Sequence, residues 1–201
     1  MGIASPRHLV VLAFITLYTR CVRTASTQHD PDPAIKVRFY DRAGVGVQTL
    51  ERAERQVKLI FKRVGVEAEW VEDAEPQFRI LIVEQMDPVM ASRGDVFGYA
   101  PRDPDGTSSG MAYVAYTPIR AFVRNPEPGG PRLNASEMLA YCIAHEIGHL
   151  LLPPGSHSPT GIMRARWRST DLALIATGRL LFTPEQAKII KDQAVQRTQR
   201  H

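Results

Sequence analysis

The feature that most constrains the fold is a long apolar segment, residues 138–152, into which three ionisable side chains are set. It reads MLAYCIAHEIGHLLL, with His145, Glu146 and His149 among aliphatic and aromatic residues. A segment this apolar is expected in the core, where a carboxylate and two imidazoles are costly to bury without a metal ion or a partner. The segment therefore predicts a buried helix that also carries a functional site.

Both ends of this helix are marked in the sequence. Asn134 with Glu137 three residues later is typical of a capping box at a helix start. Leu152 precedes Pro153 and Pro154, which disfavour further helix. We therefore expect one helix to run from just after Asn134 to about Leu152.

The spacing of the three ionisable residues suits a hydrolytic metal site. On a helix, His145 and His149 lie about 40° apart around the axis, so both imidazoles can reach one ion. Catalytic Zn²⁺ takes three protein ligands and keeps a fourth position for water. Glu146 is expected to lean towards that position and to accept a proton from the water. Since H-E-x-x-H also occurs by chance, an ordinary pair of helical histidines is the alternative.

The longer stretch HEIGHLLLPPGSHSPTGIM, residues 145–163, resembles the motif of the metzincin metallopeptidases, most closely that of the matrixin-like members. The resemblance implies a site with the following residues: zinc ligands His145, His149 and His157, general base Glu146 and Met-turn residue Met163. One departure is the spacing, because His157 follows His149 by eight residues where the family has six. Gly155 is the expected substitute for the glycine at which the family's chain leaves the helix.

An acidic third ligand, as in thermolysin-like zinc peptidases, is the alternative to His157. Glu185 is the only glutamate downstream of the motif, but the run Thr183–Gln186 around it indicates a helix start. Asp171 is the aspartate candidate, and it opens an apolar helical stretch where it can act as a cap. Cys142 lies on the same helical face as His145, and a packed core thiol is the alternative to a ligand role.

The remaining segments predict an α+β fold. Strands are expected at 35–40, 66–71 and 78–83, and short strands at 96–100 and 111–116. A helical repeat from Leu50 to Val64, ended by Gly65, follows the first strand. Residues 124–133 read as irregular, and two helices follow Met163, the last from about Pro184. We predict a metzincin-like zincin: a mixed, mostly parallel, twisted sheet of about five strands with a backing helix, an active-site helix and C-terminal helices.

The same resemblance places the fourth strand at the edge of a substrate cleft. Residues 94–101, GDVFGYAP, look like the matrixin edge strand, so we expect Gly98, Tyr99 and Ala100 to line the cleft. There a peptide would bind as an added antiparallel strand; an ordinary edge strand is the alternative. Arg164 and Trp167 are expected to border the main specificity pocket.

The N-terminus predicts a signal peptide over residues 1–25, with residues 26–201 as a single metalloprotease-like catalytic domain. The apolar run from Leu9 to Tyr18 matches a signal-peptide core and falls short of the roughly 20 residues that span a bilayer. We therefore expect a secreted or periplasmic protein without a stable membrane span. An uncleaved membrane anchor is the alternative.

Charge and cysteine content limit the possible partners. The chain has 25 basic and 21 acidic residues, and removal of the three arginines in residues 1–25 leaves 22 basic ones. This near-neutral chain shows no basic-aromatic pattern, so we expect no nucleic-acid partner. Only Cys142 would remain after cleavage, so no intramolecular disulfide is expected.

Together these features predict a monomeric endopeptidase that holds one catalytic Zn²⁺ and acts on a peptide or protein substrate. A zinc-stabilised binding or structural protein on the same fold is the competing hypothesis. Glu146 discriminates between the two, because a closed structural site wants a fourth ligand and has no need of an acid beside an open position.

Overall fold

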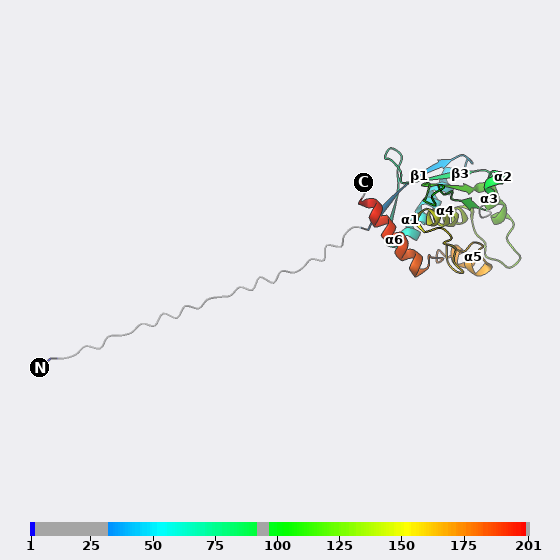
Figure 1. Cartoon of the computed structure of the whole chain (residues 1–201). Coiled ribbons are helices and arrows are strands. Elements are labelled where there is room, and N and C mark those ends of the chain that lie inside the picture. Colours follow the sequence, from blue (N-terminus) through cyan, green and yellow to red (C-terminus); the bar gives the residue numbers. More distant parts are fainter. Residues whose placement is uncertain (3–31, 92–96, 200–201) are drawn as a thin grey trace. The chain divides into compact units, whose positions relative to one another are not determined.

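One five-stranded sheet organises the computed structural model, which describes residues 1–2, 32–91 and 97–199. Nearly all of the predicted signal peptide, and residues 94–96 of the expected cleft strand, lie outside the described residues. Residues 32–91 and 97–199 belong to one compact unit, Pro31–His201 (Figure 1).

The strands follow the order β2-β1-β3-β5-β4, and every neighbouring pair is parallel except β4 with β5. Their bounds are β1 Ala34–Asp41, β2 Glu67–Trp70, β3 Phe78–Val83, β4 Gly98–Tyr99 and β5 Met111–Ala115. β4 is thus an edge strand, as expected of the segment assigned to the cleft. The prediction of a mixed, mostly parallel sheet of about five strands is confirmed.

Six helices occur among the described residues: α1 Val47–Lys62, α2 Pro88–Ala91, α3 Tyr116–Arg124, α4 Ala135–Leu151, α5 Ser169–Ala176 and α6 Pro184–Thr198. The backing helix α1, the motif helix α4 and the two C-terminal helices were predicted. α2 and α3 were not. β5 passes directly into α3 without a turn residue, and the N-cap position, Ala115, makes no side-chain cap. The one available signal was Pro118, which is compatible with the first turn of a helix.

The core lies between the sheet and the helices α1 and α4. In β3, alternate side chains are buried, namely Phe78, Ile80 and Ile82, as expected for a strand that packs one face on a core. α1 buries Ala53, Val57, Ile60 and Phe61 and packs against α4. In Figure 1 the strands lie at the top of the unit, α1 and α4 below them, and α5 below α4.

α4 is buried on all sides. Fourteen of its 17 residues are buried, so it lies inside the molecule and lacks the polar face of a surface helix. Asn134 Oδ1 accepts the Glu137 backbone N–H at 2.9 Å, and Glu137 Oε2 accepts the Asn134 N–H at 3.0 Å. The predicted capping box and the end of the helix before Pro153 are therefore confirmed.

Across the part of the chain that the structure describes, no helix combines the length and apolarity that a membrane span requires.

Replacing Asn134 by alanine should lower the free energy of unfolding by about 1 kcal/mol, because the first turn of α4 loses its side-chain acceptor. Urea unfolding followed by circular dichroism measures the change. Asn134→Asp keeps an acceptor oxygen and serves as the matched control. Equal stability of the alanine variant and the parent protein would contradict the role of the cap.

Candidate metal site

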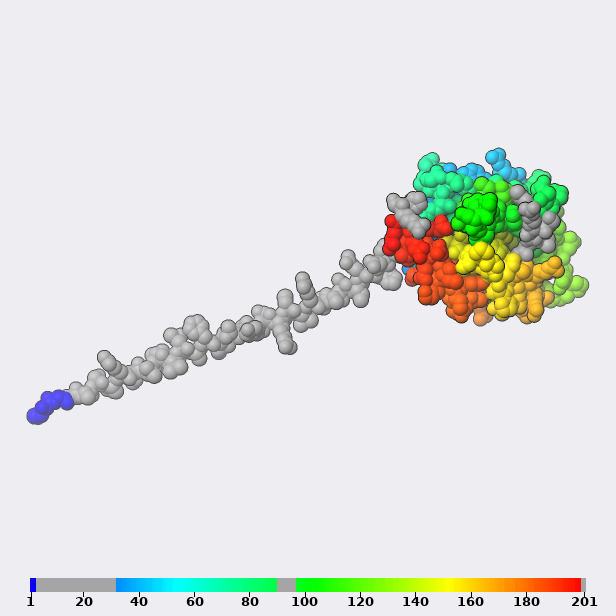
Figure 2. All heavy atoms as spheres, in the orientation of Figure 1, coloured from blue at the N-terminus to red at the C-terminus, as the bar shows by residue number. Residues whose placement is uncertain are grey.

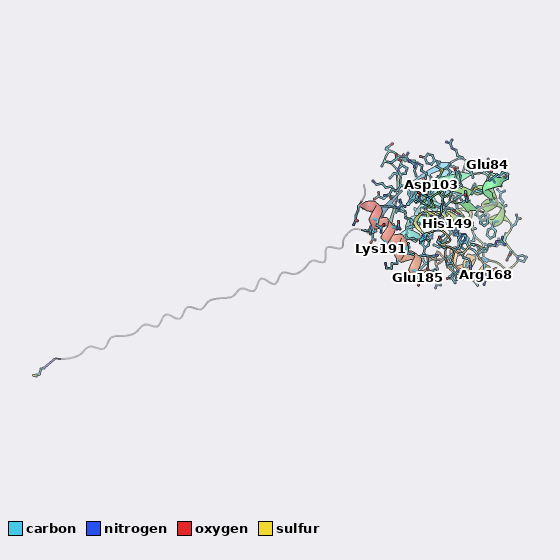
Figure 3. All side chains as sticks on the ribbon, viewed as in Figure 1. Glu84, Asp103, His149, Arg168, Glu185 and Lys191 are labelled. Atoms are coloured by element: carbon cyan, nitrogen blue, oxygen red, sulfur yellow. The ribbon has the colours of Figure 1, made fainter. Side chains whose placement is uncertain are left out.

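Three histidines converge at the end of α4. His145 and His149 come from α4, one turn apart, and His157 comes from the loop that follows the helix. One ring nitrogen of each lies within 4.8 Å of the others, and among the described residues these three form a group that could hold a metal ion. Figure 3 labels His149 on α4. The structure thus brings together the three histidines that the sequence singled out.

The ring of His145 is oriented by a buried hydrogen bond. Its Nδ1 lies 2.8 Å from the carbonyl oxygen of Ile162, which can only accept, so Nδ1 carries the proton. Its Nε2 faces the cluster, 3.0 Å from Nε2 of His149, and in the neutral ring with its proton on Nδ1 this is the nitrogen that keeps a lone pair. Two zinc–nitrogen bonds at a tetrahedral angle separate their nitrogens by roughly 3.3 Å, so this pair fits one zinc ion closely. Such a carbonyl partner behind a ligating imidazole is usual at metal sites.

Met163 lies directly beneath α4, at Gly148. Met163 is fully buried, and a Cβ added at Gly148 would overlap its Sδ and come within 3.0 Å of the Phe182 ring. Gly148 is therefore the position that lets the returning chain pack against the helix between His145 and His149. The role of Met163 as a Met-turn residue stays a prediction.

The loop between His149 and His157 absorbs its two extra residues in a turn at Gly155. Gly155 has φ of +72°, a conformation that favours glycine, and the expected shift of the turn to this residue is confirmed. Gln186 of α6 then fixes the loop on both sides of His157. Its Nε2 donates to the Ser156 carbonyl at 2.9 Å and to the Ser158 hydroxyl at 3.1 Å.

Glu146 faces the edge strand β4. Glu146 is only 2% exposed, and a Cβ added at Gly98 would overlap the Glu146 carboxylate. The edge strand therefore approaches the carboxylate so closely that any side chain at position 98 would require the carboxylate to move. Of the other expected cleft residues, Tyr99 pairs with Tyr113 in the sheet, and Tyr99 and Ala100 are both half-buried.

A cavity of about 400 Å³ opens beside His145 and Glu146. We call it the apolar cavity, since most of its lining is apolar: Phe97, Phe122, Met138, Cys142, Trp167 and Leu172. Arg164 also lines it, as expected for residues just after Met163, and its charge is paired with Asp171 at 2.6 Å. Cys142 lies in the cavity wall and outside the histidine group, which favours a packed thiol over a ligand.

The two acidic alternatives for a third ligand lie elsewhere. Asp171 accepts hydrogen bonds from the Arg164 side chain and from the Arg168 backbone N–H at the start of α5. Glu185 is exposed in the first turn of α6, where its own backbone N–H and the Thr183 hydroxyl lower the pKa of its carboxyl. Both residues lie in the first turn of a helix, and neither belongs to the histidine group.

Arg102 is a residue of the site that the sequence did not reveal. It follows β4, and its Nη2 donates to the carbonyls of His149 at 2.8 Å and Leu152 at 2.7 Å, while Nη1 donates to Gly106 at 3.0 Å. Carbonyls in the last turn of a helix lack intrahelical partners, so Arg102 caps α4 from another element. In Figure 2 the green surface of the segment after β4 adjoins the yellow surface of the segment after α4.

The comparisons with known proteins give structural neighbours only. No family model and no curated protein matches the chain. Among solved structures, metalloproteinase-II from Bacteroides fragilis is similar at 11% identity and a TM-score of 0.46, over 81% of this chain and 53% of that one. Two structures of myroilysin are similar at 13% and 15% identity, with TM-scores of 0.34 and 0.31. Both cover 77% of this chain, and 63% and 66% of theirs. The chain thus spans between about half and two thirds of the length of these proteins.

Arg102→Ala should loosen the end of α4, because the carbonyls of His149 and Leu152 lose a charged donor. Charge-assisted hydrogen bonds of this kind contribute about 1.5–3 kcal/mol each, so we expect at least about 2 kcal/mol loss in the free energy of unfolding. Hydrogen exchange should accelerate first at the amides of residues 149–152. Arg102→Lys, which retains the charge on a single donor nitrogen, should lose less stability; unchanged exchange in the alanine variant would contradict the capping role.

Proposed function

We propose that this chain is a zinc-dependent endopeptidase, with His145, His149 and His157 as the ligands of one catalytic zinc ion. Glu146 is the general base, and Met163 supports the site from below. The proposal rests on one arrangement: three imidazoles, two of them from α4, converge beside the buried carboxylate of Glu146 on the same helix. This group lies next to a cavity and to the edge of the sheet.

The chain's own groups divide the work of hydrolysis. Zinc bound to the three imidazoles would polarise the scissile carbonyl and lower the pKa of a water molecule to about 7. Glu146 accepts a proton from the attacking water and passes it to the leaving amine. Ile162 holds the His145 ring through its Nδ1–H, so that Nε2 keeps a lone pair for the ion. Gly98 leaves room for the Glu146 carboxylate.

The edge of the sheet supplies a place for the substrate backbone. Among the described residues β4 pairs only with β5, so an extended peptide can add to its other side through backbone hydrogen bonds. Tyr99 and Ala100 lie on this edge, with Gly98 beside Glu146. We therefore propose that these three residues line the cleft and that the apolar cavity takes an apolar side chain next to the bond that is cut.

A purely structural zinc site fits these residues less well. Among the described residues no fourth histidine, cysteine or acid joins the group of three, whereas a closed structural site is four-coordinate. A buried carboxylate at the open side is what a hydrolytic site needs.

We also propose that the protein is exported, with a signal peptide over residues 1–25 ahead of one catalytic domain. N-terminal sequencing of the secreted product tests this proposal.

Two variants should show that zinc content and peptide cleavage depend on different residues. Glu146→Gln should keep zinc and lose about 10²- to 10⁴-fold in kcat, since the base is removed and the ligands remain. His157→Ala should lose zinc, measured by metal analysis after dialysis against a weak chelator. Glu185→Gln removes the rival acid and should change neither quantity. Full turnover in Glu146→Gln would refute the base, and unchanged zinc in His157→Ala would refute the ligand.

Gly98→Ala should also lower turnover without changing metal binding. The added methyl group would occupy the position of the Glu146 carboxylate, so the carboxylate must move while the histidines stay in place. We expect at least tenfold lower kcat with parental zinc content, in line with the sensitivity of catalysis to the position of its groups. Gly46→Ala, where an added methyl group meets open space, is the control. Parental kcat in Gly98→Ala would contradict the close approach.

A further inference from the structure

A second hollow adjoins the candidate metal site and differs from the apolar cavity in charge. It measures about 560 Å³ and is lined by residues 157–159 and 164–168. We call it the arginine groove. It begins at His157 and shares the wall formed by residues 164–167 with the apolar cavity. A peptide with one side chain in the cavity would therefore pass along the groove.

The arginines of this groove are not equivalent. Arg164 forms an ion pair with Asp171, and both side chains are largely buried, at 15% and 8% exposure, so its charge is compensated. Arg166 and Arg168 are exposed and have no ion-pair partner among the described residues (Figure 3 labels Arg168). The groove thus keeps two permanent positive charges, because a guanidinium does not lose its proton in proteins.

The described lining of the groove contains no acidic side chain to offset these charges. A guanidinium offers a planar pair of donors that matches a carboxylate, so an exposed pair of arginines in a concave surface favours an anionic group of that shape. Arg166 lines both hollows, which places one of the two charges at the junction between them.

We propose that the arginine groove is a subsite for a substrate carboxylate, and that the protein prefers peptides with an acidic residue close to the residue in the apolar cavity. Successive residues of an extended peptide rise about 3.3 Å, so the carboxylate would belong to one of the next two residues. An aspartate or glutamate side chain and a free C-terminal carboxylate share this chemistry. The inference rests on the proposed peptidase function and adds the substrate class to it.

The test uses internally quenched peptides with leucine next to the cleaved bond and glutamate, glutamine or lysine at each of the next two positions. For the parent protein at low salt, kcat/KM should be roughly threefold to tenfold higher with glutamate than with glutamine at one position, and lowest with lysine. The preference should shrink at high salt, because both arginines are exposed. Peptides that end at that position as the acid or the amide distinguish a terminal carboxylate from a side chain.

The variant Arg166→Gln/Arg168→Gln should cleave the three peptides at similar rates, so that its ratio of kcat/KM for the glutamate peptide over the glutamine peptide falls to about one. Arg52→Gln, an exposed arginine of α1, is the matched control and should keep the glutamate preference. Equal rates on glutamate, glutamine and lysine peptides by the parent protein would overturn the subsite.

A binding measurement separates this inference from the proposed function. Zinc-loaded Glu146→Gln protein is titrated with fluorescent forms of the same peptides, and the glutamate peptide should bind roughly threefold to tenfold more tightly than the glutamine peptide. If no peptide is cleaved by the parent but this difference holds, the peptidase proposal fails and the carboxylate subsite stands. Equal dissociation constants overturn the subsite whatever the turnover.

Discussion

The hydrogen bond from His145 Nδ1 to the Ile162 carbonyl is the interaction on which the rest of the site depends. It joins residues 17 positions apart inside the core, where neither group can turn to water instead. Breaking it would leave the buried Nδ1–H of His145 unpaired, which costs about 1–3 kcal/mol, whereas the Ile162 carbonyl would keep the Trp167 indole N–H as a donor at 3.1 Å. The bond fixes the return of the chain under α4, and with it the positions of Met163 and of the loop that carries His157.

α4 lies at the centre of the core and also carries His145, Glu146 and His149. Both demands restrict which residues can pack against the helix. Gly98 and Gly148 mark two places where another segment comes so close that a side chain would collide with Glu146 or with Met163. Close packing of this kind holds catalytic groups in one geometry, because a dense interior deforms little. The ionisable groups that are costly to bury are therefore also the ones that the packing holds most firmly.

Much of this could be predicted from the sequence, because its signals are local. Periodicity, the Asn134 cap and the Pro153 stop define α4, and the H-E-x-x-H spacing pairs His145 with His149. The remaining determinants act between elements far apart in the chain. Arg102 reaches the end of α4 across 47 and 50 residues, and nothing in its own neighbourhood distinguishes it from a surface arginine. The helix α3 escaped prediction because no turn separates it from β5.

Gln186 shows how one side chain can couple two parts of the molecule. Its Oε1 accepts the Thr183 N–H that starts α6, while its Nε2 donates to the Ser156 carbonyl and to the Ser158 hydroxyl, one on each side of His157. By thermodynamic reciprocity, whatever fixes His157 also stabilises the start of α6, and fraying of α6 weakens whatever His157 holds. The stability of α6, which contributes no histidine, would thus depend on whether the histidine site is occupied.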